Sequence, residues 1–197
     1  MEHAGSAVAQ RAGALFARQR NRSGLVLILA GAGSNGGDGF VAARHLDNAG
    51  FPLRVALLAN PSRLAGSAQL NFEILKRLKV PVAILSTLAR WHRWAAKVST
   101  PRIAIDALLG IGISGSVREP IASAIHWLNR QKCPVLSVDI PSGLSADSGR
   151  PSPVAVRATE TLTCGILKRG LISREGRPWC GRLRVIDIGL PRKLKRR

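Results

Sequence analysis

Short apolar runs alternate along the chain with longer stretches that mix hydrophobic and polar positions. The runs contain few polar residues, which is typical of strands buried on both faces of a parallel sheet; they lie at residues 25–30, 53–58, 80–85, 102–105 and 135–138. The intervening stretches carry apolar residues every three or four positions and predict helices, at residues 39–49, 64–78, 88–98 and 120–129. Strands that alternate with helices in this way predict an α/β fold.

The pattern changes towards both ends of the chain. Beyond residue 157 two further strands are expected, at 159–163 and 183–188, joined by a glycine-rich connection. Residues 1–22 are expected to form an amphipathic N-terminal helix, although its arginine-rich part could also mimic a transit peptide, and 192–197 form a basic tail. Without an internal repeat or linker, we expect a single domain over 1–197: a Rossmann-like three-layer αβα sandwich with a mostly parallel central sheet.

Composition narrows the possible partners. A hydrophobic content of 46% indicates a globular chain, and the longest apolar run, from Leu25 to Ala32, is too short to span a membrane. Three scattered cysteines predict free thiols in the cytoplasm. The net charge of +19 would attract phosphates, nucleic acid or acidic lipid, or else reflects arginines on a solvated surface. Scarce aromatic residues leave few stacking platforms, so nucleic acid is not expected as the main partner.

A glycine-rich loop follows the first predicted strand. Residues 31–36 fit the pattern G-x-G-x-x-G, in which backbone N–H groups approach an anion at the start of a helix. A dehydrogenase of this type would also carry an acidic residue at the end of the second strand. Residues 57–60 contain no carboxylate, so a dinucleotide oxidoreductase is the less favoured interpretation.

Three aspartates stand close to the ends of predicted strands. Asp38 lies in the first turn after the glycine-rich loop, Asp106 follows the fourth strand and Asp139 the fifth. Each alone could cap a helix or a turn. The carboxyl ends of strands in a doubly wound sheet line one crevice, so the three aspartates are expected to converge there.

The sequences around these aspartates are more specific than the glycine pattern. Ser34-Asn35-Gly36-Gly37-Asp38-Gly39, Asp106-Ala107-Leu108-Leu109-Gly110 and Val138-Asp139-Ile140-Pro141-Ser142-Gly143 resemble the three loops that mark the YjeF N-terminal domain family. Residues 1–5 are similar to that family's first-helix motif, and 168–171 and 187–191 to its closing strands. The resemblance therefore extends over essentially the whole chain.

This resemblance implies an NAD(P)H-hydrate epimerase, an isomerase that interconverts the R and S forms of NADHX and NADPHX for metabolite repair. It implies functional coupling to an ADP- or ATP-dependent dehydratase and a possible homodimer. It implies substrate binding by Ser34, Asn35, Gly36, Gly37, Asp38, Gly110, Ile111, Gly112, Ile113, Ser114, Gly115, Ser116 and Asp139. It also implies one potassium ion per subunit, held by Asn35, Asp106 and Ser142, and Asp139 as the catalytic residue at C6 of the substrate.

Some features depart from the family or stay open. Ser34 stands where the family commonly has Asn, and the chain begins at the first-helix motif itself, without a preceding segment. Lys168 could assist catalysis, bind phosphate or be solvated, whereas the histidines fall on predicted helices and receive no role. A non-catalytic RNA- or protein-binding module on the same fold remains the alternative.

Overall fold

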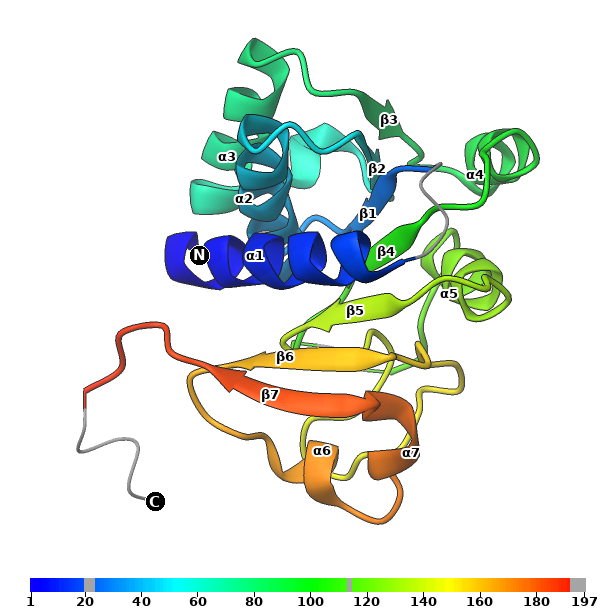
Figure 1. Cartoon of the computed structure of the whole chain (residues 1–197). Helices are drawn as coiled ribbons and strands as arrows, with labels where there is room; N and C mark the ends of the chain where they lie inside the picture. The colour runs from blue at the N-terminus through cyan, green and yellow to red at the C-terminus, as the bar shows by residue number, and fades with distance from the viewer. Residues whose placement is uncertain (20–23, 113–114, 192–197) are drawn as a thin grey trace.

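Seven parallel strands form one continuous sheet (Figure 1). The computed structural model describes residues 1–19, 24–112 and 115–191. The strands are β1 (Val26–Ala30), β2 (Leu53–Leu57), β3 (Val82–Ile84), β4 (Ile103–Ala107), β5 (Val135–Val138), β6 (Glu160–Cys164) and β7 (Arg182–Ile186). They are arranged in the order β3-β2-β1-β4-β5-β6-β7, and every neighbouring pair is parallel. The predicted α/β class is therefore confirmed, with both C-terminal strands also parallel to the rest.

Helices cover both faces of the sheet. They are α1 (Glu2–Arg18), α2 (Ser34–Asn48), the 3₁₀ turn η1 (Pro61–Arg63), α3 (Gly66–Arg77), α4 (Leu88–Ala95), α5 (Ile121–Asn129), α6 (Arg169–Ile172) and α7 (Arg177–Cys180). Figure 1 shows α1, α2 and α3 on one face and α4 and α5 on the other, which gives the predicted three layers. The connection between β6 and β7, for which the sequence predicts only a glycine-rich segment, contains the short helices α6 and α7.

Alternate residues of each central strand enter two separate cores. In β1, Val26 and Ile28 pack towards α1, α2 and α3, whereas Leu27 and Leu29 pack towards α4 and α5. All four side chains are fully buried. Because both faces are covered, the strand has no polar position, which explains the continuous apolar run in the sequence.

The chain reverses its direction of winding between β1 and β4. β2 and β3 lie on one side of β1, and β4 to β7 lie on the other. In open α/β sheets, ligands bind beyond the carboxyl ends of the strands at such a switch point. The loops that follow β1, β4 and β5 are therefore those expected to build a site.

The predicted ends of the chain fall partly outside the described residues. The N-terminal helix is confirmed as far as Arg18, and residues 20–23 and the basic tail 192–197 lie outside. In the part of the chain that the structure describes, no helix is long and apolar enough to cross a membrane.

Candidate functional site

A fully buried carboxylate marks the carboxyl end of β4. Asp106 Oδ2 accepts hydrogen bonds from Ser137 Oγ at 2.8 Å and from the Ser142 backbone N–H at 2.9 Å. Its Oδ1 accepts from Ser142 Oγ at 2.5 Å and from the Leu108 N–H at 3.3 Å. Burial raises the pKa of Asp106, and these hydrogen bonds, those from Ser142 above all, act against the rise. The carboxylate thereby ties β4 to the loop after β5.

Asn35 extends this cluster to the start of α2. Its Nδ2 donates to the Leu109 carbonyl at 2.9 Å, and Ser142 Oγ lies 3.2 Å from the same carbonyl. Asn35 is buried, and its Oδ1 has no hydrogen-bond partner in the part of the chain that the structure describes. A buried oxygen without a partner costs free energy unless a ligand or an ion satisfies it. The three residues that the family resemblance implies as cation ligands therefore come together around Leu109.

The chemistry of this cluster suits a hard cation. Amide, carboxylate, hydroxyl and carbonyl oxygens are the donors that alkali and alkaline-earth ions prefer, and the free Oδ1 of Asn35 supplies an unused one. Across the described ranges, no group of three or more His, Cys, Asp and Glu side chains could hold a metal ion. The oxygen donors present therefore fit a hard, oxygen-coordinated cation better than zinc.

The glycines of the first loop allow the backbone to pack closely. A Cβ on Gly31 would lie 1.9 Å from the Leu108 carbonyl oxygen, and one on Gly36 would lie 2.0 Å from the Gly31 carbonyl oxygen. Gly37 has a similar role, because its Cβ would meet the Met1 side chain at 2.5 Å. Gly33 has open space around it. Gly36 and Gly37 thus have packing roles, and the Gly37 N–H already donates to the Gly33 carbonyl at 3.1 Å.

The second loop is more open than the first. Ile111 is 63% exposed, and a Cβ added at Gly112 or Gly115 would meet none of the described residues within 4 Å. Gly110 lies beside Asn35, since its Cβ would be 3.5 Å from the Asn35 Cβ. Ile113 and Ser114, also expected to bind substrate, lie outside the described residues.

Asp139 occupies an unusual backbone conformation directly after β5. Its φ is 64°, and the Ile140 N–H donates to the Val138 carbonyl across it at 2.7 Å, which closes a γ-turn. Its own N–H donates to the Leu162 carbonyl on β6 at 2.7 Å. These bonds hold the side chain at the carboxyl edge of the sheet, and its exposed fraction is 16%.

Three further titratable groups surround Asp139. Lys168 Nζ is ion-paired with Asp139 Oδ1. Burial raises the pKa of Asp38 to about 6; the Met1 amino group, 3.8 Å from its Oδ1, opposes this rise, and the charge of Asp139 adds to it. Burial also raises the pKa of the Cys164 thiol to about 12, helped by the charges of Asp139 and Asp38. The thiol therefore remains neutral, which excludes it as a nucleophile near pH 7.

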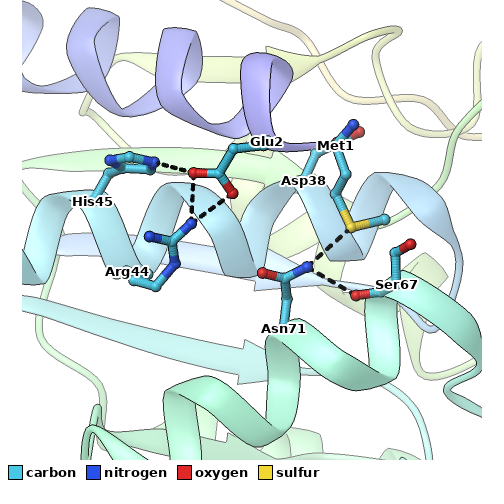
Figure 2. A network of polar contacts seen from close by, with 7 residues as sticks. All are labelled: Met1, Glu2, Asp38, Arg44, His45, Ser67 and Asn71. Carbon is cyan, nitrogen blue, oxygen red and sulfur yellow. Dashed lines mark hydrogen bonds and ion pairs between the residues drawn. The ribbon is translucent and has the colours of Figure 1, made fainter.

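A polar network holds the start of α1 over α2 (Figure 2). Glu2 accepts two hydrogen bonds from Arg44 at 2.6 Å and contacts His45 Nε2 at 2.8 Å. Asn71 of α3 donates to the Met1 sulfur at 3.4 Å. The Met1 side chain thus fills the space above Gly37, next to Asp38. His45, to which the sequence assigned no chemistry, makes a polar contact with Glu2 that joins α2 to α1.

Sizeable hollows of the described surface lie away from this site. One, of about 460 Å³, is lined by residues of α4 and α5, including Trp91 and Trp127. Another, of about 410 Å³, lies between α1 and α2 and is lined by Gln10 and Phe51 among others. Neither contains any of the three aspartates. The cluster of buried polar groups identifies the candidate site better than surface shape does.

A comparison with protein families agrees with the three-loop arrangement. Residues 1–170 match the family described as YjeF-related protein N-terminus. The chain belongs to this family. The YjeF N-terminal family match spans α1, the three loops and Lys168, and so contains every residue assigned to the site.

Curated relatives and a solved structure extend the likeness over nearly the whole chain. The chain is 39% identical over 194 residues to an NAD(P)H-hydrate epimerase of Pirellula staleyi, covering 98% of this chain and 83% of that one. It is 39% identical over 199 residues to the bifunctional NAD(P)H-hydrate repair enzyme Nnr of Pyrobaculum aerophilum, covering 97% and 37%. The crystal structure of yeast ynu0 (YNL200c) matches with a TM-score of 0.79 at 25% identity, covering 98% and 80%.

The bifunctional relatives are longer proteins. The chain spans 37% of the Pyrobaculum aerophilum enzyme and 32% of the one from Salinibacter ruber, or about a third of each. What those whole proteins do beyond the shared region is therefore a property of the relatives.

Proposed function

We propose that this protein is an NAD(P)H-hydrate epimerase, an isomerase that interconverts the R and S forms of NADHX and NADPHX. The observation that carries the proposal is the cluster of Asn35, Asp106, Ser142 and Asp139 at the carboxyl edge of the sheet, on the loops that mark the family. Relatives named NAD(P)H-hydrate epimerase are similar in sequence to this chain over nearly its full length.

The substrate would lie across the ends of β1, β4 and β5. Its pyrophosphate suits the start of α2, where Ser34 and the free backbone N–H groups of the first turn would meet it at the positive end of the helix. Gly112, Gly115 and Ser116 are exposed and would contact the dinucleotide from the second loop. The strongly basic chain favours a ligand that carries phosphates.

One potassium ion per subunit would be held by Asn35, Asp106 and Ser142, with the Leu109 carbonyl beside them. The support is the unpartnered Oδ1 of Asn35 and the oxygen-rich surroundings. When bound, such an ion supplies positive charge that offsets repulsion between Asp106 and the phosphates of the substrate.

The reaction requires loss and return of a hydroxyl group at C6 of the hydrated nicotinamide ring. Asp139 would lie against C6, where its negative charge stabilises the cationic ring left when the hydroxyl departs. Water then adds to the opposite face and gives the other epimer, with Asp139 assisting proton transfer. The two carboxyl-end loops after β4 and β5 fix the ring relative to this carboxylate.

Repair would be completed by a separate activity. An epimerase supplies the single epimer that an ADP- or ATP-dependent dehydratase accepts, and the relatives named bifunctional repair enzymes suggest that this chain is coupled to such a dehydratase.

Incubation with purified R-NADHX tests the proposal. We expect chromatography to show conversion to an equilibrium mixture of R and S forms faster than the spontaneous reaction measured without protein. The same assay with R-NADPHX ranks the two substrates. An unchanged rate for both would contradict the proposed activity and favour a non-catalytic RNA- or protein-binding module.

A further inference from the structure

The described contacts of the Asp139 carboxylate converge on one oxygen. Oδ1 accepts from the Cys164 N–H at 2.9 Å and from Lys168 Nζ, with Thr163 Oγ1 at 3.5 Å. Within the ranges that the structure describes, Oδ2 has no hydrogen-bond partner. One oxygen is thus fixed by the protein, and the other is available to a ligand.

Lys168 is held in place by the turn after β6. Its Nζ also donates to the Cys164 carbonyl at 3.0 Å. Gly165 begins this turn with a φ of 70°, and its N–H donates to the Ile186 carbonyl at 2.8 Å. The residue packs closely, because a Cβ added at Gly165 would lie 2.5 Å from Leu190 Cδ1. The Lys168 side chain is 17% exposed. The ammonium group is therefore positioned by the fold and still reachable by a ligand.

The ion pair limits what each partner can do. A carboxylate that accepts hydrogen bonds from an ammonium group and a backbone N–H is stabilised in its charged form. In this ion pair the ammonium group carries the proton, and the carboxylate has an oxygen, unbonded among the described residues, that could receive one. Departure of a hydroxyl group from carbon requires a proton, and the ammonium group of Lys168 is the proton-bearing group in contact with Asp139.

We propose that Lys168 is a second catalytic residue, which donates the proton to the departing C6 hydroxyl while Asp139 accepts a proton from the incoming water. This inference rests on the proposed epimerase function. It requires the C6 edge of the ring to lie against the pair, with Nζ towards one face and Oδ2 towards the other.

The proposed steps balance in protons and electrons. As the C6–O bond breaks, its electron pair stays on oxygen, which takes a proton from Lys168 Nζ and leaves as water. The lone pair of the ring nitrogen forms the nitrogen–carbon double bond. Water then bonds to C6 from the other face, the double-bond pair returns to nitrogen, and a proton passes to Asp139 Oδ2. Transfer of a proton from Asp139 to Lys168 across the ion pair restores both groups.

Two substitutions separate the charge of Lys168 from its proton. Lys168→Met keeps the length of the side chain and removes both, whereas Lys168→Arg keeps the charge on a group that hardly releases a proton. With R-NADHX as substrate, we expect both variants to lose about 10²- to 10⁴-fold in kcat, with a smaller change in KM. Lys76→Met is the matched control, because Lys76 forms an exposed ion pair with Glu73 at 3.0 Å and should retain the wild-type rate.

A rescue experiment distinguishes proton donation from positioning. Methylammonium added to Lys168→Ala should restore part of kcat in proportion to its concentration, and the melting temperature identifies any variant that fails to fold. A wild-type kcat in Lys168→Met or Lys168→Arg would overturn the inference. A folded Lys168→Ala variant that is slow and that no amine rescues would also overturn it. The epimerase function would stand in either case. A wild-type protein that does not epimerise R-NADHX would overturn both.

Discussion

Asp139 has a backbone conformation that most residues avoid. A φ of 64° costs about 1–3 kcal/mol for an ordinary side chain, and Asp and Asn adopt it more readily than others. Bonds to Leu162 and across the γ-turn hold the residue there. The strained backbone aims the carboxylate at the site, so Asn is the substitution that changes the chemistry and preserves the shape.

Asp139→Asn should therefore remove catalysis and leave the fold intact. An amide cannot accept a proton at neutral pH, and we expect kcat to fall about 10²- to 10⁴-fold with little change in dinucleotide affinity or melting temperature. Kinetics on R-NADHX, corrected for the spontaneous reaction, and thermal unfolding measure this. Asp147→Asn, at an exposed position, is the control. Wild-type turnover by the Asp139→Asn variant would make Asp139 structural and move attention to Asp38.

The proposed cation site makes a prediction for stability. Potassium at ten times its dissociation constant would stabilise the fold by about 1.4 kcal/mol, which raises the melting temperature by roughly 3–6 °C. Asn35→Ala should lose this response because it removes the free Oδ1. Ser137→Ala should keep it, since Ser137 bonds Asp106 without belonging to the ligand set. Equal unfolding curves in potassium and in tetramethylammonium chloride would count against the site.

At the scale of residues, the sequence points to side chains of the candidate site but not to the backbone groups that they contact. The aspartates, Asn35 and Ser142 could be selected because they stand in recognisable loops at strand ends. The Leu109 carbonyl and the Cys164 N–H were missed, since a backbone group leaves no trace in residue identity. The pairing of Lys168 with Asp139 was left open, because it depends on how the turn after β6 folds back.

At the scale of secondary structure, the start of α2 determines the geometry of the site. The helix begins at Ser34, five residues before the predicted start at Gly39. Helix propensity argues against glycine there, but contact with neighbouring backbone requires it at Gly36. The same close approach brings Asn35 to Leu109. Tertiary packing thus overrides the local preference that placed the boundary too late.

Two glycines of the site should respond differently to substitution. Gly36→Ala would place a methyl group 2.0 Å from the Gly31 carbonyl oxygen, so we expect a loss of folded protein or a markedly lower melting temperature. Gly112→Ala should fold normally because no described residue would lie within 4 Å of the added Cβ. Gly112→Asp should also fold but bind a nicotinamide dinucleotide more weakly, through repulsion of its phosphates. Calorimetric titration that finds unchanged affinity for Gly112→Asp would remove the second loop from the binding site.

At the scale of the whole molecule, the carboxylate of Glu160 links α1 to the C-terminal half of the sheet. Glu160 of β6 is 3% exposed and bonds Arg11 of α1 at 2.6 and 2.7 Å and Arg184 of β7 at 2.6 Å. Burial raises the pKa of Glu160, but the hydrogen bond from Arg11 and the charges of both arginines outweigh it, so the pKa is lowered. The alternation of strands predicted the layers, whereas this long-range contact could not be predicted from local pattern.

This contact should make the fold sensitive to acid. Because the pKa of Glu160 is lower in the folded state than in the unfolded state, its stabilisation is complete above the unfolded value and is lost as the pH falls through the folded value. Glu160→Gln should lower stability by about 2 kcal/mol at pH 7, since Arg11 and Arg184 are partly exposed. Urea unfolding from pH 7 to pH 3 should show a smaller loss for the variant; parallel curves would contradict this role.

The arrangement of β6 and β7 has a consequence for how turnover depends on temperature. Asp139 is hydrogen-bonded to Leu162 and Cys164 of β6, and the turn that carries Lys168 follows the same strand. That turn is hydrogen-bonded to β7, which lies at the edge of the sheet. The dinucleotide loops belong to the centre of the sheet instead. Edge strands open before central ones as a protein is warmed. The rate of epimerisation should therefore pass through its optimum several degrees below the melting temperature, while nucleotide affinity persists until the whole fold is lost.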